Sequence, residues 1–306
     1  MIIGGSKEYC VCQSINSKAG IAIVCRISLA LESLNLSMLP VSGLRSVRYL
    51  ILSAALLLPF SSVFTQQPST ATFYIERGAF LWHHADYEGA ISSYTRAIEI
   101  DEETMRVPQA HKPVASRLAN TYLTRAEVRS VCRIFEGAFA DIDRALQLLP
   151  RWAEAYYRRG FIYQMSGDAN DAVIQYSKAI DIDPRHARAY KDRGYSRSDI
   201  GDLDGALNDY DTSLKIDPTD VQAYFFRGAT RSDRRDYAGA IADYSRMIEL
   251  APNNALGYQM RGLLFLVMGS DSEAESNLTK YLQLRPDDKS GIKLQIDRIK
   301  ARRTQH

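Results

Sequence analysis

Residues 155–163 read Ala-Tyr-Tyr-Arg-Arg-Gly-Phe-Ile-Tyr, and they belong to the clearest of several similar units in the chain. Their apolar side chains recur at i, i+4 and i+7, which is the spacing of one face of a helix. Gly167 and Asp168 then supply turn chemistry, and a second apolar stripe at helical spacing follows. Pro184 ends that stripe, because proline cannot continue a helix. Residues 152–185 are therefore predicted to form a helical hairpin.

The same unit recurs with a period of 34 residues. Each copy carries Tyr-x-x-Arg, then a small residue, and an alanine twelve residues after the small one. The small residues are Gly78, Ala126, Gly160, Gly194, Gly228 and Gly262, and the alanines are Ala90, Ala138, Ala172, Ala206, Ala240 and Ala274. The first step, from 90 to 138, is 48 residues, which is 34 plus an insertion of 14. A fixed period of this length indicates a solenoid of stacked helical hairpins.

These units resemble the tetratricopeptide repeat (TPR) family, whose pattern has small residues near positions 8, 20 and 27, an aromatic near 24 and proline near 32. Position 32 is proline in the last five copies, at Pro150, Pro184, Pro218, Pro252 and Pro286. The resemblance covers six units over residues 71–286 and implies an all-α, right-handed superhelical solenoid of antiparallel helix pairs. The insertion, residues 105–118, is expected to form a lengthened loop plus an extra helical turn, with Pro113 in the first turn of the helix that follows.

Residues 287–306 are expected to form a capping helix with a basic tail. Ile292, Ile296 and Ile299 lie at i, i+4 and i+7, and charged residues between them would give the helix a polar outer face. A solenoid needs a terminal cap of this kind to stay soluble.

The first seventy residues do not follow the repeat. Two arginines precede the apolar run 49–60 (YLILSAALLLPF), and polar residues come after it. This order is typical of a secretory signal, and the run is shorter than the roughly 20 residues that cross a bilayer as a helix. We interpret residues 38–70 as the signal peptide of an exported, periplasmic or secreted protein. An uncleaved inner-membrane anchor at residues 49–64 is the alternative, and residues 1–37 are interpreted as a disordered upstream extension.

The composition shows no sign of catalysis or nucleic-acid binding. Lys and Arg number 38 against 36 Asp and Glu, which lacks the basic footprint of a nucleic-acid-binding domain. The sequence has no phosphate-binding glycine loop, nucleophile elbow or His-Glu-x-x-His motif. His83 and His84 are neighbours on a predicted helix and point apart, and Cys10-x-Cys12 lacks the second ligand pair of a zinc site. We expect no enzymatic activity, no cofactor and no metal site.

An arginine directly precedes the small residue of every unit, at Arg77, Arg125, Arg159, Arg193, Arg227 and Arg261. One interpretation is a ladder of anion-binding groups. A feature shared by all six units is better explained by structure, so we expect inter-repeat ion pairs with acids such as Asp141, Asp209 and Asp243 on the second helices. The arginine stems would cover apolar surface. Function is expected where the copies differ.

In the family that the chain resembles, the first helix of each unit lines a concave groove near positions 2, 5, 9, 12 and 13. Carried onto the middle units, this implies a partner-binding groove at Tyr157, Phe161, Gln164, Arg188, Lys191, Tyr195, Phe225 and Asp233. Aromatic groups between charges of both signs suit an extended or helical peptide. Some family members grip a C-terminal carboxylate with Lys and Asn at positions 5 and 9, but Lys191 is followed there by Tyr195, which argues against such a clamp.

The first helix of the sixth unit is apolar nearly all round. Its candidate interface residues are Leu256, Met260, Leu263, Leu266 and Val267. A helix of this kind is normally buried on every side, so we expect residues 290–302 to fold back and cover part of it. The rival interpretation is an apolar patch kept for a partner or for dimerisation.

Together these features predict a non-catalytic protein–protein interaction scaffold of the cell envelope, which binds a peptide or helix of a partner protein in its concave groove. The alternative is an assembly or regulatory subunit that acts through self-association, as a homo-oligomer, or through its outer surface. An RNA-binding helical repeat is a third class, which the neutral charge and the Asp-Pro repeat ends disfavour.

Overall fold

The computed structural model describes residues 70–106 and 111–303. The expected signal peptide or anchor and the upstream extension lie outside the described residues. Each of the six units is a pair of helices, whose members we call the first and the second helix. The all-α solenoid of helix pairs expected from the sequence is confirmed.

The bounds of the helices follow the period. The first helices of units 1 to 6 are α4 (Ala71–His83), α6 (His111–Val131), α8 (Ala153–Ser166), α10 (Ala187–Asp199), α12 (Val221–Asp233) and α14 (Ala255–Met268). The second helices are α5 (Tyr87–Met105), α7 (Phe135–Leu148), α9 (Ala169–Ile182), α11 (Leu203–Ile216), α13 (Tyr237–Leu250) and α15 (Asp271–Leu284). A short 3-10 turn, η3 (Pro286–Asp288), leads into the last helix, α16 (Lys289–Arg303).

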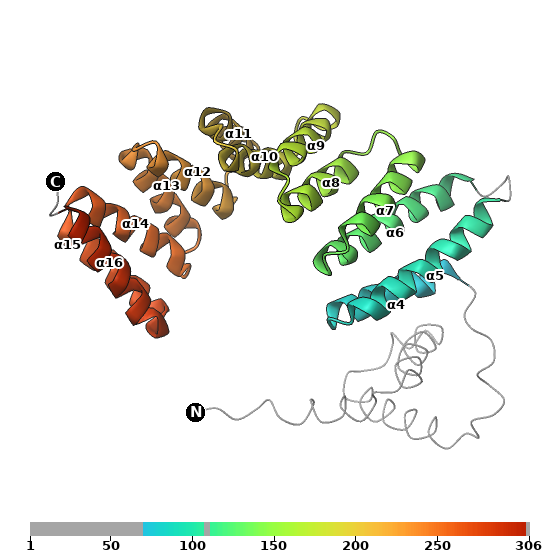
Figure 1. Ribbon diagram of the computed structural model, residues 1–306, viewed down its shortest axis with the longest axis horizontal. Coiled ribbons are helices and arrows are strands. Elements are labelled where there is room, and N and C mark those ends of the chain that lie inside the picture. The colour runs from blue at the N-terminus through green and yellow to red at the C-terminus, as the bar shows by residue number, and fades with distance from the viewer. Residues whose placement is uncertain (1–69, 107–110, 304–306) are drawn as a thin grey trace, which may run out of the picture.

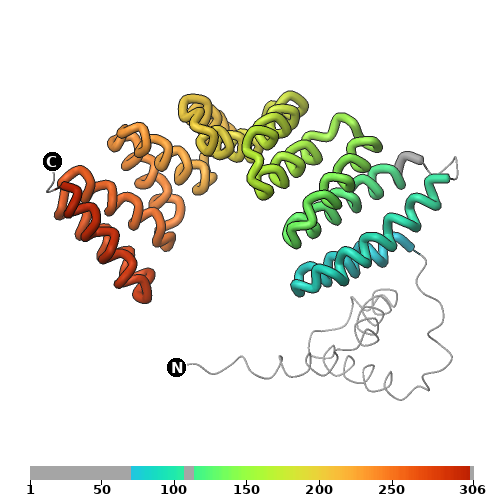
Figure 2. Tube along the Cα trace, in the orientation of Figure 1, coloured from blue at the N-terminus to red at the C-terminus, as the bar shows by residue number. Residues whose placement is uncertain are grey.

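The six pairs follow one another along an open arch, with α4 and α5 at one end and α14 to α16 at the other (Figures 1 and 2). First helices of neighbouring units contact one another directly: α6 with α8, α8 with α10, and α10 with α12. Within the described ranges, the second helices of neighbouring units make no comparable contact. The closer spacing of the first helices places them on the inner side of the arch.

The repeated glycine allows the close crossing of the two helices within a pair. A Cβ atom on Gly160 would lie 2.7 Å from Cδ1 of Tyr176, so the tyrosine ring fills the space that a side chain would need. Unit 2 has Ala126 in place of glycine, and the smaller Ile142 stands there in place of tyrosine. In unit 2 the larger residue on the first helix thus goes with a smaller one on the second, whereas unit 6 combines Gly262 with Leu278.

The repeated arginine joins its own unit to the preceding one. Arg193 donates from Nε and Nη2 to Asp209 of its own second helix, at 2.9 and 2.7 Å, and from Nη1 to Ser177 of the preceding unit, at 2.9 Å. The same double contact recurs at Arg125 with Asp141 and Thr95, at Arg227 with Asp243 and Asp211, and at Arg261 with Asn277 and Ser245. The expected acids Asp141, Asp209 and Asp243 do pair with these arginines, but within one unit and not between units. Across units, Arg159 and Arg227 pair with Asp143 and Asp211, and the other arginines named here donate to hydroxyl groups.

Three of the aspartates that pair with the repeated arginines also accept from a second arginine, which lies one turn further along the first helix. Arg129, Arg197 and Arg231 donate at 2.8 Å to Asp141, Asp209 and Asp243. Units 3 and 6 have the amides Gln175 and Asn277 at the position of the acid, and Tyr163 and Phe265 at the position of the second arginine. In these five units the second arginine is present only where a carboxylate pairs with it.

The insertion lengthens helices on both sides of the loop. α5 has 19 residues and α6 has 21, whereas α9 has 14. α6 begins at His111, so Pro113 lies in its first turn as expected. Arg117 of α6 pairs with the buried Asp101 of α5 at 2.5 Å, which fixes the extended ends together. The expectation of a lengthened loop was therefore only partly right, because residues 111–118 are helical.

Candidate functional site

An aromatic strip lies on the inner side of the arch, on the first helices of units 3 to 5. Phe161 of α8 and Tyr195 of α10 occupy the same position in successive units, and they are 37% and 38% exposed. Tyr195 rests edge-on against Phe226 of α12, with ring centroids 5.1 Å apart. Phe225 is partly buried beside Phe226, at a centroid distance of 5.4 Å. Phe161 and Tyr195 are thus exposed as predicted, whereas Phe225 also packs on the buried cluster of unit 5.

Two other predicted groove residues are buried and contact their own fold. The hydroxyl of Tyr157 donates to Asp192 Oδ2 of α10 at 2.8 Å, and its ring packs on Tyr176. Lys191 Nζ donates to Gln222 Oε1 at 2.9 Å and lies 3.4 Å from Asp220 Oδ2. Tyr157 and Lys191 therefore join neighbouring units and are not free to contact a partner, which corrects the sequence-based assignment.

The remaining predicted groove residues differ in how free they are. Gln164 accepts a hydrogen bond from the hydroxyl of Tyr176, at 2.7 Å. Arg188 is exposed, but its guanidinium lies over the Tyr157 ring and donates to Glu154. Asp233, at the end of α12, is exposed and makes no hydrogen bond or ion pair. Asp233 is therefore free to meet a partner, whereas Gln164 and Arg188 are partly engaged.

The cations near the N-terminal ends of these helices are already paired. Arg158 donates to Glu154 at 2.7 Å and also pairs with Glu127 of α6, and Arg188 donates to Glu154 at 3.2 Å. Burial raises the pKa of Glu154, but hydrogen bonds from His186 and Arg158 and the charge of Arg188 outweigh it and hold the pKa at about 2. This carboxylate therefore stays ionised at neutral pH and pairs with the cations around it.

One polar group on this face was missed by the sequence analysis. The hydroxyl of Tyr244 is buried and has no hydrogen-bond partner. Its counterpart Tyr176 donates to Gln164, and Tyr210, whose own unit has Ser198 at the position of Gln164, is hydrogen-bonded to Thr230 of the next unit. Tyr244 has Ser232 and Leu264 at these two positions. The signal was therefore in the sequence, but only when both positions are considered together.

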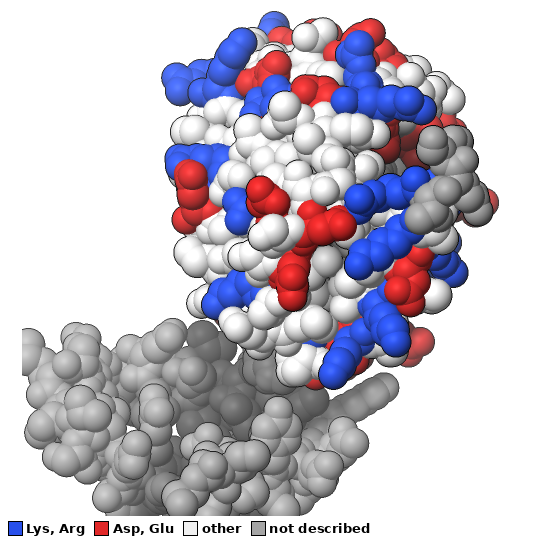
Figure 3. All heavy atoms as spheres, turned by 90° about the vertical axis from the view of Figure 1, so that its left-hand side faces the viewer, with Lys and Arg blue, Asp and Glu red and all other residues white. Residues whose placement is uncertain are grey.

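The apolar helix of unit 6 is covered only in part by α16. Ile292 of α16 is fully buried, and it packs with a cluster that includes Leu263. Leu266 is buried, and Met260 is partly buried against the cluster of Ala240, Tyr244, Met247 and Leu264. Further residues stay exposed on α14 and α16: Leu256, Val267, Met268 and Leu294. Seen from this end, basic and acidic side chains are interspersed, and uncharged surface lies between them (Figure 3).

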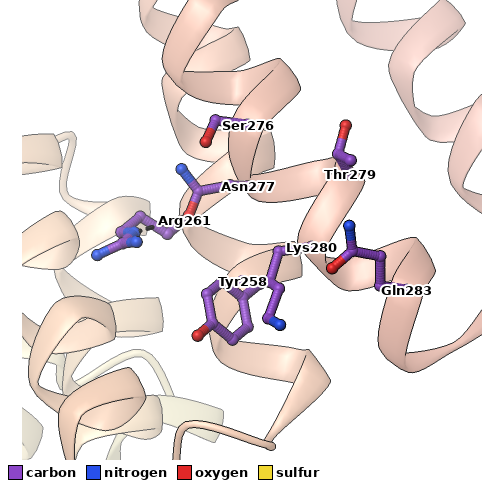
Figure 4. A pocket seen from close by; sticks show the side chains of 7 residues that line it. All are labelled: Tyr258, Arg261, Ser276, Asn277, Thr279, Lys280 and Gln283. Carbon is purple, nitrogen blue, oxygen red and sulfur yellow. Dashed lines mark hydrogen bonds between the residues drawn. The ribbon is translucent and has the colours of Figure 1, made fainter.

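An open pocket of about 480 Å³ lies between α14 and α15. Tyr258 and Arg261 line it from α14, and Lys280 lies beside the Tyr258 ring (Figure 4). Arg261 donates to Asn277 Oδ1 at 2.9 Å. The pocket is polar, and the sequence analysis did not single it out.

The residues that the structure describes also bear on metal sites and membrane spans. Among residues 70–106 and 111–303, no group of three His, Cys, Asp or Glu side chains is placed to hold a metal ion. None of the helices described is both long enough and apolar enough to cross a bilayer.

Comparison with known families identifies the repeat. Residues 153–186 and residues 191–255 each match a model of the tetratricopeptide repeat. The fold and these matches define the class: the chain is a tetratricopeptide repeat protein, which is a scaffold for protein–protein interaction.

Solved structures share the fold at low sequence identity. PilW, described as a widely conserved type IV pilus biogenesis factor, is similar with a TM-score of 0.61 and 16% identity, covering 72% of this chain and 95% of PilW. Pseudomonas aeruginosa pilF has a TM-score of 0.60 and 18% identity over 76% of this chain and 97% of its own. YrrB, described as a TPR protein with an unusual peptide-binding site, has a TM-score of 0.50 and 21% identity over 60% and 92%. No curated protein sequence matches the chain significantly.

Proposed function

We propose that the protein binds an extended or helical segment of a partner protein along the inner side of its arch, on α8, α10 and α12. The exposure of Phe161 and Tyr195 carries the proposal, because two exposed aromatic side chains at the same position of successive units offer a ligand similar contacts one repeat apart. Aromatic anchors of this kind often dominate the binding energy, at about 2 kcal/mol or more each.

The surroundings of the strip support a ligand with both apolar and polar groups. Tyr195 is held against Phe226, so little side-chain entropy is lost when a ligand packs on it. Asp199 and Asp233 end α10 and α12 as exposed carboxylates without ion pairs. A segment that places apolar side chains on the strip and hydrogen-bond donors beside it fits this surface.

The test is a matched pair of variants of the full chain. A partner is captured from the cells that make the protein, purified, and titrated by isothermal calorimetry. We expect Phe161→Ala with Tyr195→Ala to weaken binding at least about tenfold, as the loss of two anchors implies, with unchanged helical content by circular dichroism. The control is Ile174→Ala on α9, since Ile174 is 49% exposed on a second helix. Equal affinities of the two variants would place the binding site elsewhere.

We also propose that the scaffold works in the cell envelope. The support is the sequence order of residues 45–67, basic, apolar and then polar, which is that of an export signal. N-terminal sequencing of protein recovered from the envelope fraction should find a start near residues 65–72. A cytoplasmic protein that keeps residues 45–64 would contradict this location.

A second candidate function is self-association through the C-terminal end. The exposed apolar residues of α14 and α16 favour it, and Met268 and Leu294 are among the most exposed of them. Light scattering of the full chain tests this candidate. A dimer that Met268→Glu with Leu294→Glu converts to a monomer supports it, and a monomeric native chain excludes it.

A further inference from the structure

The pocket between α14 and α15 contains two cations and no acid. Arg261 and Lys280 line it together with hydroxyl and amide side chains, including Ser276 and Thr279 (Figure 4). Lys280 makes no ion pair, and Arg261 meets only neutral acceptors: Asn277 at 2.9 Å and Ser245 of the preceding unit at 2.9 Å. Two positive charges thus stand in a polar pocket without a counter-charge on its walls.

In unit 5, the positions that correspond to those of the two pocket cations hold cations that are paired with acids. Thirty-four residues earlier, Arg227 donates to the carboxylate of Asp243, and Arg246 pairs with Glu249 at 2.8 Å. Unit 6 keeps a cation at both positions of unit 5. Its acids are replaced by their amide counterparts, since Asn277 stands for Asp243 and Gln283 for Glu249. The side-chain skeletons of the two acid positions are preserved, and both negative charges are gone.

The charge on Arg261 is not well compensated by the fold. Burial lowers the pKa of Arg261, and the neighbouring Tyr258 opposes this shift. In units 2, 4 and 5 the corresponding arginines bind buried aspartates. A partly buried guanidinium that meets only an amide and a hydroxyl gains most from an added carboxylate, because charge-assisted hydrogen bonds are about twice as strong as neutral ones.

We propose that this pocket binds an acidic segment of a partner protein, whose carboxylates supply beside Arg261 and Lys280 the two negative charges that Asp243 and Glu249 supply in unit 5. The two cations sit at separate positions, one on each helix, which suits two carboxylates on neighbouring side chains better than one small anion. Hydroxyl and amide donors around them can satisfy the remaining carboxylate oxygens. The pocket is open, so a peptide can reach it without a change of fold.

The test uses the full chain and three defined probes. A fluorescein-labelled octapeptide of alternating Asp and Glu is titrated by anisotropy, the matching Asn and Gln peptide serves as the uncharged reference, and inorganic phosphate is added as a competitor. We expect the acidic peptide to bind and the amide peptide not to bind. Asn277→Asp with Gln283→Glu restores the pattern of unit 5, and it should weaken binding about tenfold or more, as the loss of a charge-assisted contact implies.

A matched control separates the pocket from total charge. Asn208→Asp with Gln147→Glu adds the same two charges on α11 and α7, and position 147 in unit 2 corresponds to position 283 in unit 6. Acidic-peptide affinity should be unchanged in this control. Equal losses in both double variants, or no binding of the acidic peptide by the native chain, would overturn the proposal. Phosphate that displaces the peptide at equal or lower concentration would overturn it in favour of a phosphate ligand.

The binding of an acidic segment to this pocket does not depend on the proposed partner site at Phe161 and Tyr195. Phe161→Ala with Tyr195→Ala leaves the α14–α15 pocket untouched, so this variant should bind the acidic peptide as the native chain does. Loss of acidic-peptide binding in that variant would place the peptide on the inner face and reject binding in the α14–α15 pocket.

Discussion

Units 5 and 6 follow the same backbone plan, but they are stabilised in different ways. In unit 5, Asp243 is buried between Arg227 and Arg231, which donate to it at 2.5 to 3.1 Å. In unit 6, Arg261 meets the amide of Asn277, and the position of Arg231 is taken by Phe265. Unit 5 thus holds its two helices together through ionic contacts.

The terminal unit relies instead on apolar contact with its cap. Leu278 and Tyr281 of α15 form a buried cluster with Ile292 of α16, and Leu263 of α14 packs against it. The comparison teaches that one repeat pattern tolerates two solutions. A unit with neighbours on both sides can pair its charges, whereas the last unit must keep an apolar face out of water.

The largest effect is expected from placing a charge in the apolar core of unit 6. Leu266 is 3% exposed and Val267 is 40% exposed, although they are adjacent on α14. Leu266→Glu should lower the free energy of unfolding by about 3–5 kcal/mol, because apolar burial is lost and a carboxylate is buried without a partner. Val267→Glu should change it by less than about 0.5 kcal/mol. Urea titration followed by circular dichroism measures both, and equal effects would contradict the burial of Leu266.

The second-largest effect is expected from exchanging acid and amide at the shared position of units 5 and 6. Asp243→Asn should destabilise the protein by about 3 kcal/mol, since it leaves two partly buried arginines without their carboxylate. Asn277→Asp in unit 6 should change the free energy of unfolding by no more than about 1 kcal/mol, because the carboxylate gained by Arg261 is offset by burial of the new charge and by loss of the hydrogen bond from Asn277 Nδ2 to the Glu273 carbonyl. The same urea titration compares them. Similar losses in both variants would mean that the acid has no special role in unit 5.

Much of this architecture could be predicted from the repeat itself. Helix pairs, their crossing at Gly160 and Tyr176, and the exposure of Phe161 and Tyr195 depend on residues within one unit or on the position within it. These features recur every 34 residues, so each copy supports the others. The apolar first helix of unit 6 and its cover by Ile292 were likewise visible as a departure from the pattern.

Other features depend on pairs of residues in different units, and no pattern within one unit encodes them. Tyr157 can be buried because Asp192, on the next first helix, accepts a hydrogen bond from its hydroxyl. Lys191 is buried because Asp220 and Gln222 of the following unit surround its ammonium group. For the same reason, the sequence showed that the arginines have acidic partners but not which acid belongs to which unit.

A smaller effect tests the fit between the glycine and the ring in unit 5. A Cβ atom on Gly228 would lie 2.8 Å from Cε1 of Tyr244, so Gly228→Ala should destabilise the protein by about 1–3 kcal/mol through overpacking. Unit 2 accommodates Ala126 opposite Ile142. Adding Tyr244→Ile to Gly228→Ala should therefore recover part of the loss relative to the sum of the two single changes. A thermodynamic cycle of the four proteins measures this coupling, and strict additivity would show that the two positions do not share space.

The smallest effect concerns the turn between the two helices, where units 5 and 6 have the same conformation with different residues. Arg235 has a φ of 63° and Gly269 a φ of 85°, both in the left-handed region. An L side chain is strained there, so Arg235→Gly should stabilise the protein by up to about 1 kcal/mol and Gly269→Ala should destabilise it by a similar amount. Space is not the reason in unit 6, since an added Cβ would meet only the flexible end of Arg303, at 3.4 Å or more. The shift of the thermal midpoint in each variant measures the strain. A decrease on Arg235→Gly would show that the exposed arginine stabilises the turn by more than its backbone strain costs.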